Sequence, residues 1–331
     1  MTNLEAIDVK TIGELPYRWD ALSNKTILIS GGTGFLGSFF IDVIRYRNKE
    51  HQDNVKIVSL SRRGGKSDNT VTYLPTDITQ PIELDESVDY VVHLASNTHP
   101  LQYGLDPVGT ITTNVLGCFN LLELSRKLKA QKFLLASSVE IYGQGNEKPM
   151  DENYSGYIDP NSARSGYNES KRVCEALCRS YFQQYGVECV IARFSRIFGP
   201  DRKNDSKAMA QFMDCAVNGK NIVLTSMGNQ HYSYCYVADA VSALFKLLLD
   251  GKNNESYNVS ADDEGLTLGD YASLISKFAG TQVEYKIEEN PNASKITYAL
   301  LDTKKLKTLG WTPCYDVTEA LERTYHILSS R

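Results

Sequence analysis

The sequence has no long apolar run and no strong excess of charge of either sign. Its 331 residues include 35 basic and 40 acidic side chains, for a net charge of −5. No stretch approaches the roughly 20 apolar residues that cross a bilayer, and the segment 1–25 has no apolar core of a secretory signal. We therefore expect a cytoplasmic protein with no membrane or nucleic-acid partner, since nucleic acid needs a basic face.

Cysteine is too sparse and too scattered for a disulfide framework. The seven cysteines are odd in number, and several lie within apolar stretches. Cys174 and Cys178 are spaced for one helix face, but no second pair of cysteines or histidines follows at zinc spacing. We expect reduced, mostly buried thiols and no metal site.

Short β-type runs alternate with helix-length segments through the first 200 residues. The runs are KTILIS, VKIVSLS, VDYVVHLA, QKFLLASS and VECVIARFS. Strands separated by helices predict an α/β fold with a Rossmann-type, doubly wound parallel sheet and right-handed crossovers. Beyond residue 201, helices near 205–218, 237–250 and 267–279 are mixed with the short strands NIVLTS, SYNVS and VEYKI.

A glycine cluster, GGTGFLG, lies between the first strand and the first strong helix. Gly31, Gly34 and Gly37 stand at three-residue spacing, with Phe35 and Leu36 between the last two. Glycines allow a tight turn and a close approach of the backbone, and the helix N-terminus holds a pyrophosphate. We predict a dinucleotide here; a βα turn without a ligand is the alternative.

This prediction divides the chain into three parts. Residues 1–24 form an N-terminal extension, 25–200 an NAD(P)-binding Rossmann domain, and 201–331 mainly a smaller α/β substrate-binding lobe. The boundary between the last two is interleaved.

The residues after the second strand indicate which dinucleotide binds. Ser61, Arg62 and Arg63 stand there without an acid. A free ribose 2′-OH usually meets a carboxylate, whereas a 2′-phosphate prefers arginine. We predict NADP in preference to NAD, although these arginines also fit solvated loop charges. Asp77 is placed to meet the adenine edge, and the remaining expected cofactor contacts are Ile78, Leu94, Ala95 and Asn114.

A tyrosine and a lysine share one face of the helix that follows LLASSVEIYG. Tyr167 and Lys171 are four residues apart in SGYNESKR. An ammonium beside a phenol favours the phenolate, so Tyr167 can act as a base at neutral pH. With 20 tyrosines in the chain, the spacing alone is a weak signal. The pair becomes informative because it follows, in this order, the glycine loop and the strand end LLASSVEIYG.

In this order the chain resembles the extended short-chain dehydrogenase/reductase family of NAD(P)-dependent sugar-nucleotide epimerases, dehydratases and decarboxylases. The resemblance covers nearly all of residues 25–328, through GGTGFLG, VVHLAS, DPVGTITTNVLGCFNLLEL, ASSVEIYG, YNESK, ARFSRIFGP and YVADAVSAL. The segment ENYSGYIDPNSARSGYNESKR is similar to the pattern ENYxGxxxPxxxRxxYxExKR of the UDP-glucuronate decarboxylase branch.

The resemblance implies catalytic roles for residues that match its motifs. Ser138 would bond the sugar 4-OH, Tyr167 would remove its proton, and Lys171 would also hold the nicotinamide ribose. Asn114 would support the proton network of Lys171. Plainer interpretations remain: Ser138 as a polar strand end, and Asn114 as a helix residue that caps a neighbour.

Glu140 is the most informative variable position. Dehydratases and decarboxylases of this family carry an acid there to handle the C5 proton of a 4-keto sugar. The dTDP-glucose 4,6-dehydratases also have an aspartate just before it, where this chain has Val139. Dehydration stays open, because the GDP-mannose branch lacks that aspartate and has two arginines after its second strand. The alternative for Glu140 is a solvated loop acid.

The substrate side matches the family less well. Tyr103 and Arg164 match substrate-side residues of the decarboxylase branch, and Ser96 is a further expected contact. Arg196, however, stands where an asparagine contacts the substrate, and Tyr232 stands where an arginine meets the pyrophosphate. The gained cation, together with Lys207, indicates a substrate that is held differently. The nucleotide therefore stays open.

The resemblance thus implies an enzyme that oxidises a sugar nucleotide at C4 and then acts at C4 or C5, with decarboxylation or epimerisation favoured. A 4,6-dehydratase and an NADPH-dependent keto-sugar reductase are alternatives. A non-catalytic dinucleotide-binding regulator is an alternative of another class, against which the intact Ser138, Tyr167 and Lys171 argue. The family also implies a homodimer through helices that start near Pro107 and Tyr167, whose apolar positions equally fit plain core.

Overall fold

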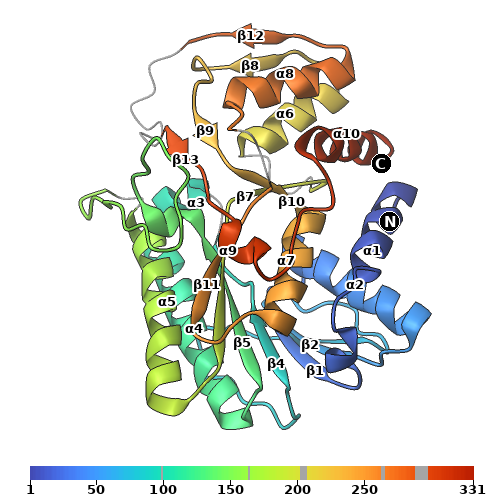
Figure 1. Cartoon of the computed structure of the whole chain (residues 1–331), viewed down its shortest axis with the longest axis vertical. Coiled ribbons are helices and arrows are strands. Elements are labelled where there is room, and N and C mark those ends of the chain that lie inside the picture. The colour runs from blue at the N-terminus through green and yellow to red at the C-terminus, as the bar shows by residue number, and fades with distance from the viewer. Residues whose placement is uncertain (98–99, 163–164, 202–206, 262–264, 288–296) are drawn as a thin grey trace.

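The computed structural model describes residues 1–97, 100–162, 165–201, 207–261, 265–287 and 297–331. Its centre is a parallel sheet of seven strands in the order β11-β6-β5-β4-β1-β2-β3 (Figure 1). The strands are β1 (Thr26–Ser30), β2 (Lys56–Ser61), β3 (Val71–Pro75), β4 (Tyr90–His93), β5 (Lys132–Ser138), β6 (Cys189–Phe194) and β11 (Glu255–Val259). The order reverses beside β1, so the predicted doubly wound Rossmann-type sheet is confirmed.

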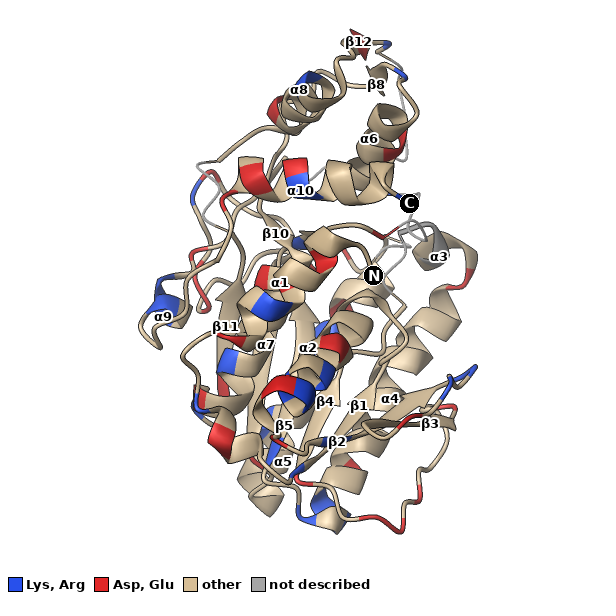
Figure 2. Ribbon diagram, turned by 90° about the vertical axis from the view of Figure 1, so that its right-hand side faces the viewer, with Lys and Arg blue, Asp and Glu red and all other residues tan. Residues whose placement is uncertain are grey.

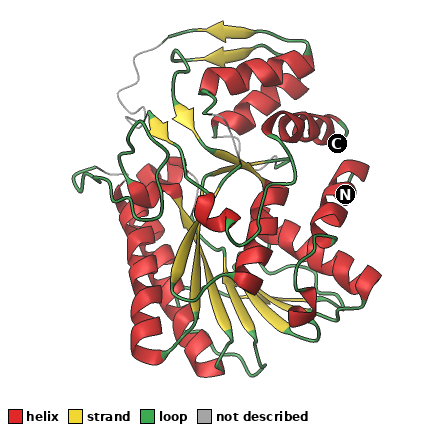
Figure 3. Cartoon of the chain, in the orientation of Figure 1, coloured by secondary structure: helices red, strands yellow, loops and turns green. Residues whose placement is uncertain are grey.

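Helices cover both faces of this sheet (Figure 3). On one face lie α4 (Pro107–Leu128) and α5 (Ser165–Tyr185); on the other lie α1 (Asn3–Gly13), α2 (Phe35–His51) and α7 (Val237–Asp250). The central strands therefore bury both of their faces: in β1, Leu28 packs in the core under α4 and α5, whereas Ile27 and Ile29 pack in the other core.

A smaller lobe stands above the carboxyl ends of the strands (Figure 1). Three parallel strand pairs, β7 with β10, β8 with β12 and β9 with β13, lie in or below it. Their bounds are β7 (Arg196–Phe198), β8 (Ile222–Leu224), β9 (His231–Tyr232), β10 (Tyr234–Tyr236), β12 (Val283–Tyr285) and β13 (Tyr298–Ala299). The lobe's helices are α6 (Ala208–Val217), α8 (Leu268–Ala279) and α10 (Val317–Ser329).

Short elements complete the chain. They are η1 (Trp19–Leu22), α3 (Pro100–Leu105), η2 (Val139–Tyr142) and α9 (Lys304–Lys307). The segment SYNVS, which lies beyond our predicted boundary at residue 200, contributes most of β11 at the edge of the large sheet. The chain therefore returns to that sheet after residue 201.

The N-terminal extension packs on both parts of the molecule. Helix α1 lies against α2 and α7, and its buried Asp8 accepts hydrogen bonds from Tyr236 Oη at 2.6 Å and Arg323 Nε at 2.9 Å. Since Arg323 belongs to α10, this carboxylate joins the extension to the smaller lobe. The two ends of the chain lie near each other as a result (Figure 1).

Acidic and basic side chains are interspersed along α2, so this helix presents no face of a single sign (Figure 2). All seven cysteines are free, and five of them are buried. Within the described residues, no helix has the length and apolar character needed to cross a membrane.

Candidate active site

A cavity of about 460 Å³ opens at the carboxyl ends of β1, β4, β5 and β6, below the smaller lobe. This edge of a doubly wound sheet, at the point where the strand order reverses, is where such folds bind ligands. Most of the predicted site residues line it: Gly31, Gly34, Phe35, Leu36, Gly37, Leu94, Ala95, Ser96, Tyr103, Ser138, Glu140, Tyr167, Lys171, Arg196, Lys207 and Tyr232.

The glycine loop has the geometry of a phosphate cradle. Gly31 has φ +80°, and a Cβ there would lie 2.8 Å from the amide nitrogen of Ala95. A Cβ on Gly37 would lie 2.3 Å from the carbonyl oxygen of Gly31. Gly34 caps α2 without a side chain, so the first amides of the helix face the cavity end of the loop. The loop therefore fits a dinucleotide pyrophosphate.

A buried histidine, which the sequence analysis did not single out, supports this loop. His93 Nδ1 lies 2.7 Å from Ser30 Oγ, and Ser30 Oγ accepts a bond from the Ala95 amide at 3.2 Å. Complete burial lowers the pKa of His93 to about 4, so the ring is neutral at physiological pH. The ends of β1 and β4 are thus fixed to each other beneath Gly31.

The residues predicted to select the cofactor lie outside the cavity lining. Arg62 and Arg63 are exposed in the turn after β2, where Ser61 Oγ donates to Gly64 O at 3.2 Å. The Asp77 carboxylate accepts from Thr79 N at 3.0 Å and from Thr79 Oγ1 at 2.8 Å. These bonds, with a smaller effect of Arg62, lower the pKa of Asp77. This acid therefore shapes its own turn.

Ile78, the residue after Asp77, is buried in the core under α4 and α5. Its side chain contacts the position of Gly117 in α4: a Cβ on that glycine would lie 2.5 Å from Ile78 Cδ1. Ile78 therefore anchors the loop after β3 to α4.

Tyr167 and Lys171 both point into the cavity from the first turns of α5. Both side chains are buried, and Lys171 Nζ donates to the carbonyl oxygen of Ala136 in β5 at 2.9 Å. The ring of Tyr103 stacks on that of Tyr167 with centroids 4.5 Å apart. The predicted pair is thus brought together with Ser138, which ends β5.

Asn114 belongs to a buried polar chain beside this pair. Its Oδ1 accepts from Ser96 Oγ at 2.7 Å, and its Nδ2 donates to Ser170 Oγ at 2.9 Å. Ser170 in turn donates to the carbonyl oxygen of Tyr167 at 2.7 Å. Asn114 therefore links α4 to the turn of α5 that carries Tyr167.

Glu140 lies on η2, directly after Ser138. Its amide donates to Ser138 Oγ at 3.2 Å, which begins the turn, and its side chain is 20% exposed. The carboxylate Oε2 accepts from Asn168 Nδ2 at 3.3 Å. Glu140 is therefore a half-buried acid at the cavity wall, not a fully solvated loop acid.

Arg196 and Tyr232, the two departures from the family pattern, contact each other. The guanidinium carbon of Arg196 lies 3.7 Å from the ring centroid of Tyr232, and Arg196 Nη2 lies 3.7 Å from Glu140 Oε1. Arg196 Nη1 is buried and has no hydrogen-bond partner within the described residues. The contact with Glu140 could not be predicted from local sequence, because the two residues come from different elements.

Lys207 is a further predicted residue on this side of the cavity. Lys207, at the start of α6, lines the cavity, and burial lowers its pKa. Arg164 lies outside the described residues.

The family model described as the NAD dependent epimerase/dehydratase family matches residues 27–260. UDP-glucuronic acid decarboxylase 5 of Arabidopsis thaliana is 33% identical over 90% of this chain and 88% of its own. UDP-glucuronic acid decarboxylase 1 of Xenopus tropicalis is 31% identical over 91% of this chain and 72% of its own.

Solved structures share the fold. An epimerase from Methanothermobacter thermautotrophicus superposes with a TM-score of 0.80, at 21% identity over 94% of both chains. The Bacillus cereus UDP-glucuronic acid 4-epimerase, solved with UDP-glucuronic acid and NAD, gives 0.76 at 22% identity, over 92% of this chain and 99% of its own.

The fold and the site define an enzyme built on a dinucleotide-binding sheet. More narrowly, the chain belongs to the NAD dependent epimerase/dehydratase family. The family resemblance read from the motifs is therefore confirmed, and family membership supports the use of NAD(P).

Proposed function

We propose that this enzyme decarboxylates a nucleotide-linked uronic acid, with UDP-glucuronic acid as the first candidate. The observation that carries the proposal is the meeting, in one cavity, of Ser138, Tyr167 and Lys171 with the acid Glu140 and the cation Arg196. The UDP-glucuronic acid decarboxylases among its relatives support the same outcome.

The first step of the proposal is oxidation at C4 of the sugar. Ser138 Oγ and Tyr167 Oη would bond the 4-OH, and Tyr167 would take its proton as C4 becomes a ketone. Lys171, which donates to the Ala136 carbonyl and lines the same cavity as Tyr167, would hold the nicotinamide ribose. When bound by the glycine loop, NAD(P) supplies the two-electron oxidant at C4.

The second step follows from the ketone. A sugar with a ketone at C4 and a carboxylate on C5 is a β-keto acid, so the C5–C6 bond breaks and its electron pair forms an enolate. Carbon dioxide leaves and a proton is added at C5. The hydride that was removed from C4 in the first step then returns to C4, which is reduced again. Glu140 would transfer the proton that is added at C5. Arg196, which faces Glu140, would pair with the negatively charged carboxylate of the uronate.

A product assay tests this proposal. The protein, loaded with NAD or NADP, is incubated with nucleotide sugars that include UDP-glucuronic acid, UDP-glucose and GDP-mannose, and products are identified by mass. We expect loss of carbon dioxide from the uronate. Unchanged mass with a new sugar isomer would indicate epimerisation, and loss of water dehydration; either outcome, or no reaction, would refute decarboxylation.

We also propose that NADP is the preferred cofactor. Arg62 and Arg63 are exposed at the end of β2, the strand end where Rossmann enzymes discriminate the ribose 2′ substituent. Fluorescence titration should give tighter binding of NADP than of NAD, and Arg62→Ala with Arg63→Ala should remove the difference. Equal affinities in the unmodified protein would show that the two arginines are solvated loop charges.

A further inference from the structure

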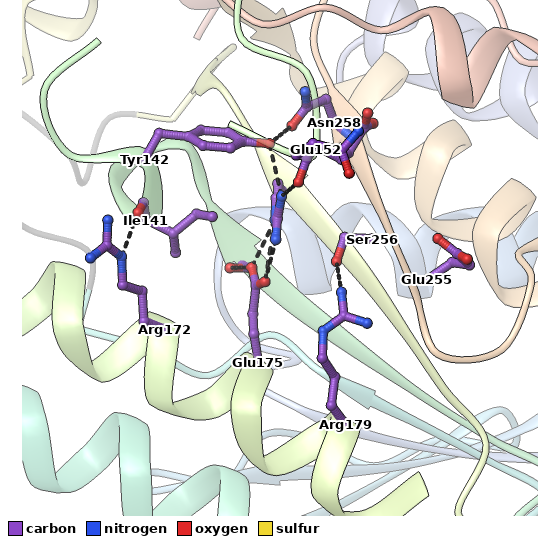
Figure 4. Close-up of polar contacts among 12 residues, drawn as sticks. Ile141, Tyr142, Glu152, Arg172, Glu175, Arg179, Glu255, Ser256 and Asn258 are labelled. Carbon is purple, nitrogen blue, oxygen red and sulfur yellow. Dashed lines mark hydrogen bonds and ion pairs between the residues drawn. The ribbon is translucent and has the colours of Figure 1, made fainter. Parts of the chain in front are cut away.

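The helix that carries Tyr167 and Lys171 also holds the turn that carries Glu140. Asn168, Arg172 and Glu175 lie at positions i, i+4 and i+7 of α5, so they form one row beside the row of Tyr167 and Lys171. Arg172 of this row reaches the backbone of η2 (Figure 4), Asn168 bonds the Glu140 carbonyl, and Glu175 bonds Ser137 at the end of β5. None of the three row residues lines the cavity.

Two carbonyl oxygens of η2 are bonded directly to this row. Asn168 Nδ2 donates to Glu140 O at 2.8 Å. Arg172 Nε donates to Ile141 O at 2.7 Å (Figure 4). Arg172 Nη2 also donates to Gly156 O at 2.8 Å. The Arg172 guanidinium therefore fixes the backbone just after Glu140 and joins it to the backbone at Gly156.

The third member of the row secures both ends of the turn. Glu175 Oε1 accepts from Ser137 Oγ at 2.6 Å, directly before Ser138, and Glu175 Oε2 pairs with Arg193 Nη2 at 2.7 Å. Arg193 Nη1 donates to Tyr142 Oη at 3.0 Å, at the end of η2.

The last bond of this network leads to the large sheet. Tyr142 Oη donates to Asn258 Oδ1 in β11 at 2.6 Å (Figure 4). Both side chains are fully buried, and so is the Glu175–Arg193 pair at the base of the network. Such bonds are costly to break, since a buried polar group left without a partner loses its hydration as well.

We infer that Arg172, together with Asn168, is a positioning residue that fixes Glu140 relative to Tyr167 and Lys171. A short 3₁₀ turn has few hydrogen bonds of its own to hold an acid in place. The bonds from α5 to this turn hold Glu140, proposed to act at C5, at a fixed position relative to Tyr167 and Lys171, proposed to act at C4. The kinetic consequence rests on the proposed function, because it assigns Glu140 to the second step.

The variant Arg172→Met tests the inference, and Arg179→Met is its matched control. Arg179 lies two turns further along α5 and donates to Asn254 O at 2.7 Å and Ser256 Oγ at 2.9 Å, away from η2 (Figure 4). Both variants remove an arginine that bonds backbone from the same helix. Only Arg172→Met releases the turn that carries Glu140.

The first readout is hydrogen–deuterium exchange of the peptide 138–144, which needs no substrate. Exchange should rise roughly tenfold or more in Arg172→Met, as expected for the loss of a charged hydrogen bond, and stay unchanged in Arg179→Met. The second readout is rapid kinetics with UDP-glucuronic acid. In Arg172→Met, reduced cofactor should form at a rate within threefold of the unmodified enzyme, while release of carbon dioxide slows at least tenfold.

Unchanged exchange, equal slowing of both steps, or the same effects in Arg179→Met would overturn the inference. If exchange rises but the unmodified enzyme converts no nucleotide sugar, the proposed function fails while the positioning of Glu140 stands. If Arg172→Met does not fold, Asn168→Ser, which removes only the bonds to Glu140, makes the same test. Failure of both variants to fold would show a purely structural role and overturn the inference.

Discussion

At the scale of single residues, the cavity wall is built from ionisable side chains removed from water. Lys171 keeps one carbonyl partner, and burial lowers the pKa of Lys207; behind the wall, His93 is held neutral beneath Gly31. Glu140 and Arg196 face each other at 3.7 Å, a contact that a charged substrate group can enter.

Tyr167 is the residue on which catalysis should depend most. We expect Tyr167→Phe to lower turnover by roughly 10²- to 10⁴-fold, since it removes the general base, and to leave cofactor binding and the melting temperature unchanged. Steady-state kinetics and thermal unfolding would measure this. A variant that keeps turnover within threefold would refute the assigned base, and one that keeps the full biological role would favour a non-catalytic regulator.

Asp239, in the first turn of α7, should make stability depend on pH. The carboxyl is fully buried and accepts from Cys314 N at 2.5 Å, yet burial outweighs its hydrogen bonds and raises its pKa to about 7. Between the unfolded value of 3.8 and about 7, the folded state binds more protons than the unfolded state. The free energy of unfolding should therefore fall as pH rises through this window.

Asp239→Asn checks this dependence. Urea unfolding at pH 5 and pH 8 should show a smaller difference in the variant than in the unmodified protein, by on the order of a few kcal/mol. The asparagine keeps an oxygen that can accept from the Cys314 amide. An equal pH dependence in both proteins would show that Asp239 titrates outside this range.

At the scale of elements, the junction of β1 and α2 requires glycine for space. The Gly31 carbonyl and the Cα of Gly32 occupy the volume beside Gly37, at 2.3 and 2.6 Å from a Cβ at that position. We expect Gly37→Ala to destabilise the fold by about 1–3 kcal/mol and to weaken dinucleotide binding.

Gly104→Ala is the matched control for that change. Gly104 is also a helical glycine, in α3, and a Cβ there would meet nothing within 4 Å. Denaturant titration and cofactor fluorescence should therefore be unchanged in Gly104→Ala. Equal behaviour of the two variants would contradict the tight packing at the glycine loop.

Contacts between elements that are distant in the chain mark the limit of what the sequence predicts. The strand before GGTGFLG, the helix after it and the Tyr167–Lys171 spacing could be predicted, because each is a local pattern within one continuous segment of the chain. The contact of Arg196 with Glu140 and Tyr232 could not, because it joins three elements distant in the chain. The row of Asn168, Arg172 and Glu175 did have a local signal, the spacing on α5, but its targets in η2 are set by the fold.

At the scale of the whole molecule, α4 and α5 leave an apolar surface uncovered. Ile111, Leu116 and Phe119 of α4 and Val173 of α5 are each 40–43% exposed. Exposed apolar patches of this kind mark interfaces. We propose that two copies of the chain pair through these helices.

Phe119→Asp should shift the protein from dimer to monomer, because it places a charge within that surface. Sedimentation velocity measures the change. Tyr285→Asp on β12, whose ring is 53% exposed on the smaller lobe, is the control and should leave the mass unchanged. The proposed interface would be contradicted if the unmodified protein sediments as a monomer, or if Phe119→Asp dimerises as strongly as the unmodified protein.

The sequence predicts a large sheet and a smaller lobe with an interleaved boundary, but it does not predict which later segments join the large sheet. The predicted second half contains α7 and β11, which pack with the large sheet, so the boundary crosses the sequence more than once. Helix α1 joins the parts through Asp8 and Arg323. Such contacts between the two ends of the chain cannot be predicted from sequence periodicity.

The central claim is that C4 is oxidised and then reduced again within one turnover, with decarboxylation in between. UDP-glucuronic acid carrying deuterium at C4 tests it most directly, with NADP-loaded or NAD-loaded protein and mass analysis of the product. We predict a product that has lost carbon dioxide and kept the deuterium. A product without the label, or a substrate that keeps its carboxylate, would contradict this account.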